Sequence, residues 1–321
     1  MNLVNSQDLL DVYYRVSRKG IGSIAERLHL GRRARVEAAW DGSETAPKFW
    51  TNIDSVRRTL NERVTGDPSV EPLRWFAAQY LAPLPALRAL SLGSGAGRVE
   101  IELSAMCRFS SLEGIEISRK LTAEANAQAE REGRRELRFL CGDILHMELS
   151  QSAYDLVFAH HSLHHFANVA AVLARAKKAL KPKGLLAFEE YVGPNRFQWR
   201  PEQLRVMNEL LKKIPARYRR RYGLSAEKTR VKAPGLLRMV ISDPSEAVDS
   251  EAILPYVRQN FDIVEMKAIG GTISQALFHD IAHNFDDPEA LPFVKMVMDE
   301  ERRLIEDGTL QSDFVFVVAR A

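Results

Sequence analysis

The sequence predicts an α/β fold, a doubly wound seven-stranded sheet, and two observations carry this prediction. From Ala89 onward, short apolar runs alternate with stretches of helical periodicity. This alternation is typical of a parallel sheet with helices on both faces. A glycine-rich turn, Gly93 to Gly97, follows the first apolar run and precedes a helical stretch. Glycines at this place let a ligand approach backbone N–H groups at a helix N-terminus.

The strands of the predicted sheet are short apolar runs at regular intervals along the chain. The candidates are Ala89–Leu92, Leu112–Ile117, Leu137–Cys141, Leu156–Ala159, Leu185–Tyr191, Ile263–Ile269 and Phe314–Ala319. Helical stretches separate them, among them Leu121–Glu132 and Val169–Leu180. Lys181 to Gly184 contains proline and glycine and predicts a turn before the fifth strand.

The length of 321 residues favours two domains or one domain with insertions. We expect a helical N-terminal extension over residues 1–82 and a ligand-binding domain over residues 83–321. The intervals 193–247 and 270–310 are too long for plain connections and are read as insertions.

The extension has helical periodicity of its own. Apolar residues between Trp50 and Val64 recur every three or four positions, and Asp67-Pro68 predicts an N-cap and first residue of a following helix.

The composition excludes several classes of protein. Hydrophobic residues make up 45% and charged residues 27%, which is typical of a globular chain and not of a disordered one. No apolar run is long enough to span a membrane, and the first residues lack the pattern of a secretory signal. Cys107 and Cys141 form neither a disulfide framework nor a thiolate metal pattern. A cytoplasmic location is therefore expected.

The glycine turn indicates a nucleotide-like cofactor and argues against two common ones. Its spacing is Gly-x-Gly-x-Gly, and the position where a dinucleotide fingerprint needs a further glycine holds Arg98. NAD is therefore disfavoured. The Gly-Lys-Ser or Gly-Lys-Thr ending of a P-loop is absent.

Two carboxylates follow the next two strands. Glu116 ends the second strand, where a carboxylate can accept both hydroxyls of a ribose. Asp143 follows the third strand, where it can accept a hydrogen bond from an adenine amine. The carboxyl ends of parallel strands meet at one edge of a sheet, so the turn and both carboxylates predict a single nucleoside site.

Five segments in this order resemble the successive motifs of class I S-adenosylmethionine-dependent methyltransferases. They are LSLGSGAGRVE, LEGIEIS, LCGDIL, YDLVFAHHSLHHF and LKPKGLLAFEEYV, within residues 89–192. The resemblance implies the Rossmann-like fold of that family, with S-adenosylmethionine as cofactor and an antiparallel seventh strand. The cofactor-binding residues that it implies are Leu92, Gly93, Ser94, Gly95, Gly97, Glu116, Ile117, Gly142, Asp143, Ile144 and His160. Glutamate stands at 116, where the family commonly has aspartate, and still reaches a ribose.

Further segments, among them EYVGPNRFQW and GGTISQALFHDIAHNF, resemble a bacterial subgroup associated with small molecules and surface glycans. We therefore expect methyl transfer to a small-molecule or glycan-like acceptor, with an oxygen as the preferred atom. An RNA or DNA methyltransferase is the first alternative. A regulatory protein that binds the cofactor without transferring its methyl group is the second. A homo-oligomer is left open.

A histidine cluster supplies candidates for a catalytic base. His160, His161, His164 and His165 are half of the eight histidines of the chain. Histidine has the side-chain pKa closest to neutrality, and a hydroxyl acceptor must lose a proton. With a helix expected to start near Ser162, not all four can face one pocket. The first choices are His160 and His164, with Glu190 as a hydrogen-bond partner for acceptor or base.

No metal is expected. A zinc site is the rival explanation of the histidines, and His279 with His283 adds a pair at helical spacing. No cysteine or third-ligand spacing supports that site, and two surface histidines on an amphipathic helix explain the pair.

Positive charge is concentrated although the net charge is only +3. Residues 205–232 contain ten Lys or Arg residues against Glu209 and Glu227. This basic segment predicts a lid for an acidic acceptor, a solvated helix face or a site for an acidic carrier protein. Nucleic acid is ranked behind a small molecule, because few aromatic residues lie among the arginines and the Asn/Asp-Pro-Pro-aromatic tetrad of base-amine methylases is absent.

Overall fold

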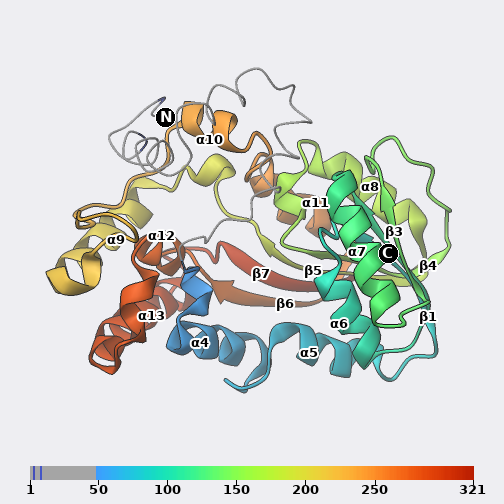
Figure 1. Cartoon of the computed structure of the whole chain (residues 1–321), viewed down its shortest axis with the longest axis horizontal. Helices are drawn as coiled ribbons and strands as arrows, with labels where there is room; N and C mark the ends of the chain where they lie inside the picture. Colours follow the sequence, from blue (N-terminus) through green and yellow to red (C-terminus); the bar gives the residue numbers. More distant parts are fainter. Residues whose placement is uncertain (1–2, 4–7, 9–47) are drawn as a thin grey trace. The chain divides into compact units, whose positions relative to one another are not determined.

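The computed structural model describes Leu3, Asp8 and residues 48–321 (Figure 1). The chain divides into two compact units. The first comprises residues 1–69, 193–246 and 269–314, and the second comprises residues 70–192, 247–268 and 315–321.

The second unit is built on a seven-stranded sheet with strand order β3-β2-β1-β4-β5-β7-β6. The strands are β1 (Leu87–Leu92), β2 (Phe109–Glu116), β3 (Leu137–Cys141), β4 (Tyr154–His160), β5 (Leu180–Tyr191), β6 (Asp262–Gly270) and β7 (Phe314–Arg320). The β1–β2, β1–β4, β2–β3 and β4–β5 pairs are parallel. In Figure 1, β6 and β7 run side by side. The predicted mostly parallel, doubly wound sheet is confirmed.

One strand differs from its prediction. The turn expected at Lys181 to Gly184 is instead part of β5, which begins at Leu180. Lys183 has a positive φ of 67°, and the β4–β5 register shifts between the pairs Tyr154↔Leu180 and Leu156↔Leu185. The extra residues therefore form a bulge inside the strand, so the proline and glycine bend the chain without ending the ladder.

Alternating residues of β4 show that both faces of the sheet are covered. Val157 and Ala159 are fully buried and belong to a core cluster that includes residues of two helices, α8 (Val169–Ala179) and α11 (Ile253–Asn260). Phe158 points to the other face, where its ring stacks on Phe76 of α5 at a centroid distance of 5.9 Å. A strand buried on both faces is what a doubly wound sheet requires.

The remaining helices of this unit connect the strands or follow α5. A single π-helical turn, η2, continues from α5, and a short 3-10 turn, η6, leads into α11. Their bounds are α5 (Pro72–Phe76), η2 (Ala77–Leu81), α6 (Arg98–Met106), α7 (Arg119–Arg131), η3 (Leu163–His165) and η6 (Ser250–Ala252). The Ser118 side chain caps α7 by accepting a hydrogen bond from the Leu121 N–H.

The first unit is helical in its described part. Its elements are η1 (Trp50–Asn52), α4 (Asp54–Thr65), η4 (Asn195–Phe197), α9 (Pro201–Lys213), η5 (Ala216–Arg219), α10 (Leu236–Ser242), α12 (Ser274–Phe278), η7 (Ala282–Asp286), η8 (Pro288–Ala290) and α13 (Leu291–Glu306). Asp67-Pro68 does not start a helix. Asp67 instead accepts hydrogen bonds from the Ser69 N–H and Oγ in a turn, and the next helix begins at Pro72.

The predicted division into an extension over residues 1–82 and a domain over residues 83–321 stays a prediction. Residues 9–47 of that extension lie outside the described part of the chain. Among the described helices, none combines the length and the apolar character needed to cross a membrane.

Candidate functional site

The candidate site is built at the carboxyl ends of four adjacent strands in the sheet unit. Leu92 of β1 pairs with Ile115 of β2 on one side and with Ala159 of β4 on the other. His160, the last residue of β4, pairs with Glu189 of β5. The glycine turn, Glu116 and the histidines therefore meet at one edge, where ligands bind in sheets of this type.

The three glycines of the turn have positive φ angles, and the space around them differs. A Cβ on Gly93 would lie 2.7 Å from the Ser162 Cβ, and a Cβ on Gly97 would lie 2.6 Å from the Phe139 Cζ. A Cβ on Gly95, whose φ is 54°, would meet no described atom within 4 Å. Two glycines thus allow close packing of the protein, while the third leaves open space at the surface of the turn.

Glu116 is bound to this turn. Its carboxylate accepts a hydrogen bond from the Gly95 N–H at 2.9 Å and another from the Ser118 N–H at 2.8 Å. Only 8% of the residue is exposed. The two backbone donors fix the carboxylate beside the open space at Gly95.

Ser94 carries a buried hydroxyl oxygen without a hydrogen-bond partner among the described residues. It lies at the base of the turn, 2.8 Å from where a Cβ on Gly114 would be. A buried hydroxyl of this kind fits a site that a polar ligand completes. Leu92 below it is fully buried, and Ile117 beyond Glu116 is half-buried.

The loop after β3 holds the next predicted residues. The Gly142 N–H donates to the Glu116 carbonyl oxygen at 2.8 Å, which links the ends of β2 and β3. Asp143 is half-buried, and its carboxylate accepts from the Leu145 N–H and contacts the His146 ring, each at 2.9 Å. The Ile144 side chain is buried in the core cluster.

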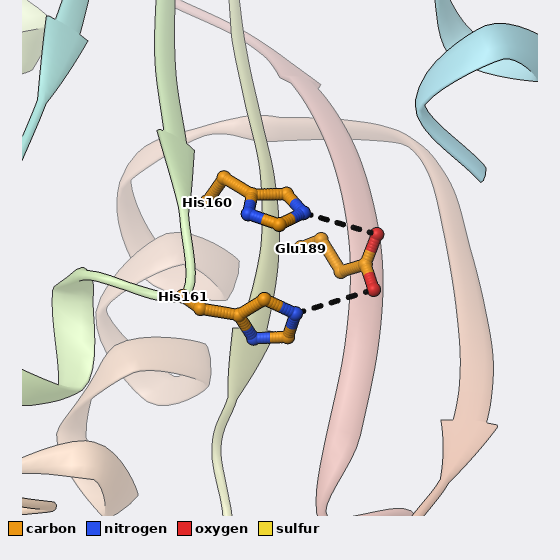
Figure 2. Close-up of side chains that lie close together, drawn as sticks. All are labelled: His160, His161 and Glu189. Carbon is orange, nitrogen blue, oxygen red and sulfur yellow. Dashed lines mark ion pairs between the residues drawn. The ribbon is translucent and has the colours of Figure 1, made fainter. Parts of the chain in front are cut away.

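His160 and His161 converge on Glu189 (Figure 2). His160 Nε2 lies 3.8 Å from Glu189 Oε2, and His161 Nε2 lies 3.4 Å from Glu189 Oε1. Burial, and secondarily the His161 charge, lowers the pKa of His160 to about 4. Burial opposes protonation of His161 too, but the Glu189 carboxylate outweighs it and raises the pKa of His161.

A second histidine–glutamate pair lies beside the first. His164 Nδ1 contacts Glu190 Oε1, and Glu190 is fully buried. The same carboxylate accepts hydrogen bonds from the Ser162 and Leu163 N–H groups at 2.8 and 2.6 Å and from its own neighbour Tyr191. Although burial opposes ionisation, the His164 charge and its hydrogen bond keep the pKa of Glu190 below its usual range.

The structure changes one of the premises behind the predicted base. No long helix begins near Ser162, because residues 163–165 form the short 3-10 turn η3 and the helix α8 starts at Val169. Glu190, predicted as a hydrogen-bond partner for the acceptor or the base, contacts His164, whereas Glu189 on the other face of β5 lies beside His160.

The explanation of His279 and His283 as a pair on one amphipathic helix is wrong. The helix α12 ends at Phe278, and His283 lies in the separate 3-10 segment η7. Burial lowers the pKa of His283.

Glu100 was not predicted as a site residue and lies directly below the glycine turn. It sits in the first turn of α6, is 2% exposed, and accepts a hydrogen bond from Ser91 Oγ at 2.5 Å. Its second oxygen has no partner among the described residues. Burial, with a smaller contribution from the Glu116 charge, raises the pKa of Glu100 to about 7. A glutamate in the first turn of a helix usually lies at the surface, where it interacts favourably with the helix dipole, so its burial could not be predicted from the sequence.

Part of the chain matches a known family of proteins. Residues 90–188 match the family described as "Methyltransferase domain". A curated relative, the sterol 24-C-methyltransferase ERG6B of Gibberella zeae, is 24% identical over 159 residues, which is 48% of this chain and 41% of that protein. The aligned region thus spans less than half the length of that relative.

Two solved structures show distant likeness. One is an S-adenosylmethionine-dependent methyltransferase from Mesorhizobium loti, with 16% identity, a TM-score of 0.46 and coverage of 78% of this chain and 98% of that one. The other is phosphoethanolamine N-methyltransferase 2 of Haemonchus contortus with S-adenosyl-L-methionine, with 13% identity, a TM-score of 0.46 and coverage of 90% and 56%.

Proposed function

Since residues 90–188 are a class I S-adenosylmethionine-dependent methyltransferase domain, as their motifs indicated, we propose that this chain is an enzyme that methylates an oxygen of a small-molecule or glycan-like acceptor. The observation that carries the proposal is the open space at Gly95 beside the fixed carboxylate of Glu116. We also propose that the enzyme is a member of the bacterial subgroup associated with small molecules and surface glycans.

The residues present fit S-adenosylmethionine, the cofactor of this domain class. When bound, this cofactor supplies a methyl group on a positively charged sulfur. We assign the glycine turn to its methionine part, Glu116 to its ribose and Asp143 to its adenine. The unpartnered Ser94 hydroxyl supports this fit, because it offers a hydrogen bond that no described protein group uses. The other residues that we assign to cofactor binding are Leu92, Ile117, Gly142, Ile144 and His160.

The proton of a hydroxyl acceptor requires a base, and the His164–Glu190 pair supports that role. A buried carboxylate on Nδ1 holds a histidine in the tautomer whose Nε2 is basic, as in other carboxylate–histidine pairs. Glu190 is a positioning residue in this scheme, because its contacts with the Ser162 and Leu163 N–H groups and with His164 hold η3 against β5. His160 was the other predicted base, and its low pKa makes it a poor one.

The basic segment 205–232 gives little support to an acidic acceptor. Arg217 pairs with Glu289, Arg219 with Glu227, and Arg221 with Asp280. Arg221 is nearly buried in its pair, with 5% of its side chain exposed. These arginines therefore stabilise their own unit, and we propose a small neutral acceptor before an acidic one or a nucleic acid.

We further propose a cytoplasmic location, as the two cysteines suggest. Cys107 and Cys141 are both free thiols.

Calorimetric titration with S-adenosylhomocysteine and transfer of a labelled methyl group test the proposal together. The wild type should bind this ligand, and Glu116→Ala should bind it much more weakly. Labelled S-adenosylmethionine should then pass its methyl group to a component of a small-metabolite extract. Binding without transfer to any fraction would favour a regulatory protein, and absence of binding would remove the cofactor assignment.

The variants His164→Asn and Glu190→Gln distinguish a role of this pair in proton removal from a purely structural role. Both variants should bind S-adenosylhomocysteine as the wild type does and should lower kcat. The loss in His164→Asn should shrink as pH rises, because hydroxide and the ionised acceptor replace the base. A loss that does not depend on pH would contradict the role of His164 as base.

A further inference from the structure

We propose that His160, His161 and Glu189 form a binding site for a divalent transition-metal ion of the zinc class (Figure 2). Each residue offers one ligand atom, and these atoms all lie within 4.8 Å of one another. The three side chains come from the ends of two neighbouring strands, β4 and β5, and point toward a common point.

The distances suit a single ion. The two nitrogen–oxygen separations are 3.8 and 3.4 Å. Ligand atoms of a tetrahedral zinc ion lie about 2.0–2.2 Å from the metal, which places neighbouring ligand atoms about 3.3 Å apart. These two separations end on different oxygens of Glu189, and the three ligand atoms lie within 4.8 Å of one another, so rotation of the side chains must close the remaining distance to an ion.

The backbone is bent in a way that brings consecutive histidines together. Neighbouring residues in a strand point to opposite faces, so His160 and His161 would ordinarily point apart. His161 instead has a φ of 50°, in the left-handed region that non-glycine residues rarely adopt. Its N–H donates to the Glu189 carbonyl oxygen at 2.9 Å, which holds the bend. Strain of this kind is concentrated at functional sites.

The donor atoms select the class of ion. Two imidazole nitrogens and one carboxylate oxygen suit Zn²⁺, Fe²⁺ and Co²⁺, whereas Mg²⁺ and Ca²⁺ prefer oxygen ligands alone. Three protein ligands leave a coordination position open, which distinguishes catalytic from structural zinc sites. The side chains of Glu189, His160 and His161 are 15%, 24% and 40% exposed, so an ion can reach them from solvent.

The position in the sheet suggests what the open coordination position takes. Ala159, which precedes His160, pairs with Leu92, which precedes the glycine turn. An ion held by His160 would therefore lie close to the proposed cofactor site, and its open position would take water or a hydroxyl oxygen of the acceptor. This role of the ion rests on the proposed function, whereas the presence of the metal site does not.

Titration of the full chain with Zn²⁺ and Co²⁺ alone tests the site without acceptor or methyl donor. The protein is purified without a polyhistidine tag and stripped with a chelator. Co²⁺ should bind at one ion per chain and give the visible absorption bands typical of an ion with a low coordination number. Zn²⁺ should displace the bound Co²⁺. His160→Asn, His161→Asn and Glu189→Gln should each weaken binding by about 100-fold or more, because loss of an outer partner alone already costs about 10- to 100-fold.

His279→Asn is the matched control, because His279 has an exposed side chain beside Asp280 and lies outside the cluster. It should bind the metal as the wild type does. Circular dichroism and the unfolding free energy check that each variant is folded, because His160 is itself assigned to cofactor binding, and Glu189→Asp keeps a ligand oxygen if Glu189→Gln is unfolded. Absence of stoichiometric binding in the wild type, or equal binding in all variants, would overturn the proposal. Metal binding together with failure of methyl transfer would contradict the proposed function alone.

Discussion

At the scale of single residues, the three glycines of the turn are alike in the sequence but have different surroundings in the structure. Gly93 and Gly97 are confined by the side chains of Ser162 and Phe139, whereas Gly95 faces open space. The sequence predicted all three as cofactor residues. It could not separate glycines needed for packing from one needed for a ligand, because that distinction depends on neighbours distant in the chain.

Gly95→Ala should weaken binding of S-adenosylhomocysteine by about tenfold or more, which is equivalent to about 1.4 kcal/mol. The new methyl group would meet no described protein atom within 4 Å and would occupy the space assigned to the cofactor. Gly133→Ala is the control, because Gly133 also has a positive φ, of 67°, and open space around its Cβ position, but follows α7. Both variants should lose about 1 kcal/mol of unfolding free energy from backbone strain. Equal ligand affinity in the two, measured by calorimetry, would refute the assignment.

Glu100 should make stability depend on pH. Burial raises its pKa from the ordinary 4.5 to about 7, so the folded state binds the proton more tightly than the unfolded state does. The stabilising contribution of the protonated group is complete below about pH 4.5 and is lost as pH rises to about 7. The difference between these pKa values is equivalent to about 3 kcal/mol at most.

Glu100→Gln does not titrate and isolates this effect. The gain in unfolding free energy of the variant over the wild type, measured with urea, should be larger at pH 8 than at pH 5.5. The same difference at both pH values would show that Glu100 is not protonated in the folded chain.

At the scale of secondary-structure elements, the sequence predicted the strands well because each is a short apolar run between polar turns. Leu137–Cys141 coincides with β3, and the other six strands were located with small errors at their ends. The largest error, at the start of β5, has a local cause at Lys183, where a bulge keeps a proline-containing segment in the strand. The short turn η3 was taken for the start of a helix, because one helical turn and a longer helix begin with the same pattern.

The convergence of His160 and His161 could not be predicted, since it depends on the left-handed backbone of a non-glycine residue. The pairing of each histidine with one of two adjacent glutamates was equally hidden. It follows from the β4–β5 register, which places His160 opposite Glu189. The sequence did indicate that one of the two carboxylates must face each side of the strand.

A buried ion pair should stabilise the helical unit. Arg63 Nη1 of α4 lies 2.8 Å from Glu301 Oε2 of α13, and Glu301 is fully buried. The other oxygen of Glu301 accepts from the Ile273 and Ser274 N–H groups at the start of α12. Arg63→Ala should therefore lower the unfolding free energy by about 3 kcal/mol or more, because it leaves a buried charge without its partner.

Arg303→Ala on the exposed face of the same helix α13 is the control, and it should leave the unfolding free energy unchanged within error. Chemical unfolding measures both variants. A small effect of Arg63→Ala, comparable with that of the control, would show that the Arg63–Glu301 pair does not stabilise the packing of α4, α12 and α13.

At the scale of the whole molecule, the structure shows which of the charges counted in the sequence are paired with one another. The basic segment 205–232 stood out in the sequence as a candidate docking surface. The structure pairs two of its arginines, Arg217 and Arg221, with carboxylates far along the chain, at Glu289 and Asp280. Sequence counts of charge could not reveal this, because the partners lie about 60 to 70 positions away.

Binding to RNA and DNA should accordingly be weak and unspecific. Fluorescence anisotropy with labelled single and double strands should show no tight complex at physiological salt. Tight binding whose affinity falls steeply with salt concentration would revive a nucleic-acid acceptor, because such a slope counts phosphate contacts.

We place the cofactor over Gly95, with its ribose on Glu116. A crystal structure of the chain with S-adenosylhomocysteine tests it most directly. We expect the ribose hydroxyls within hydrogen-bond distance of the Glu116 carboxylate and the ligand in the open space at Gly95. Ligand bound elsewhere, with both positions left to solvent, would contradict the account.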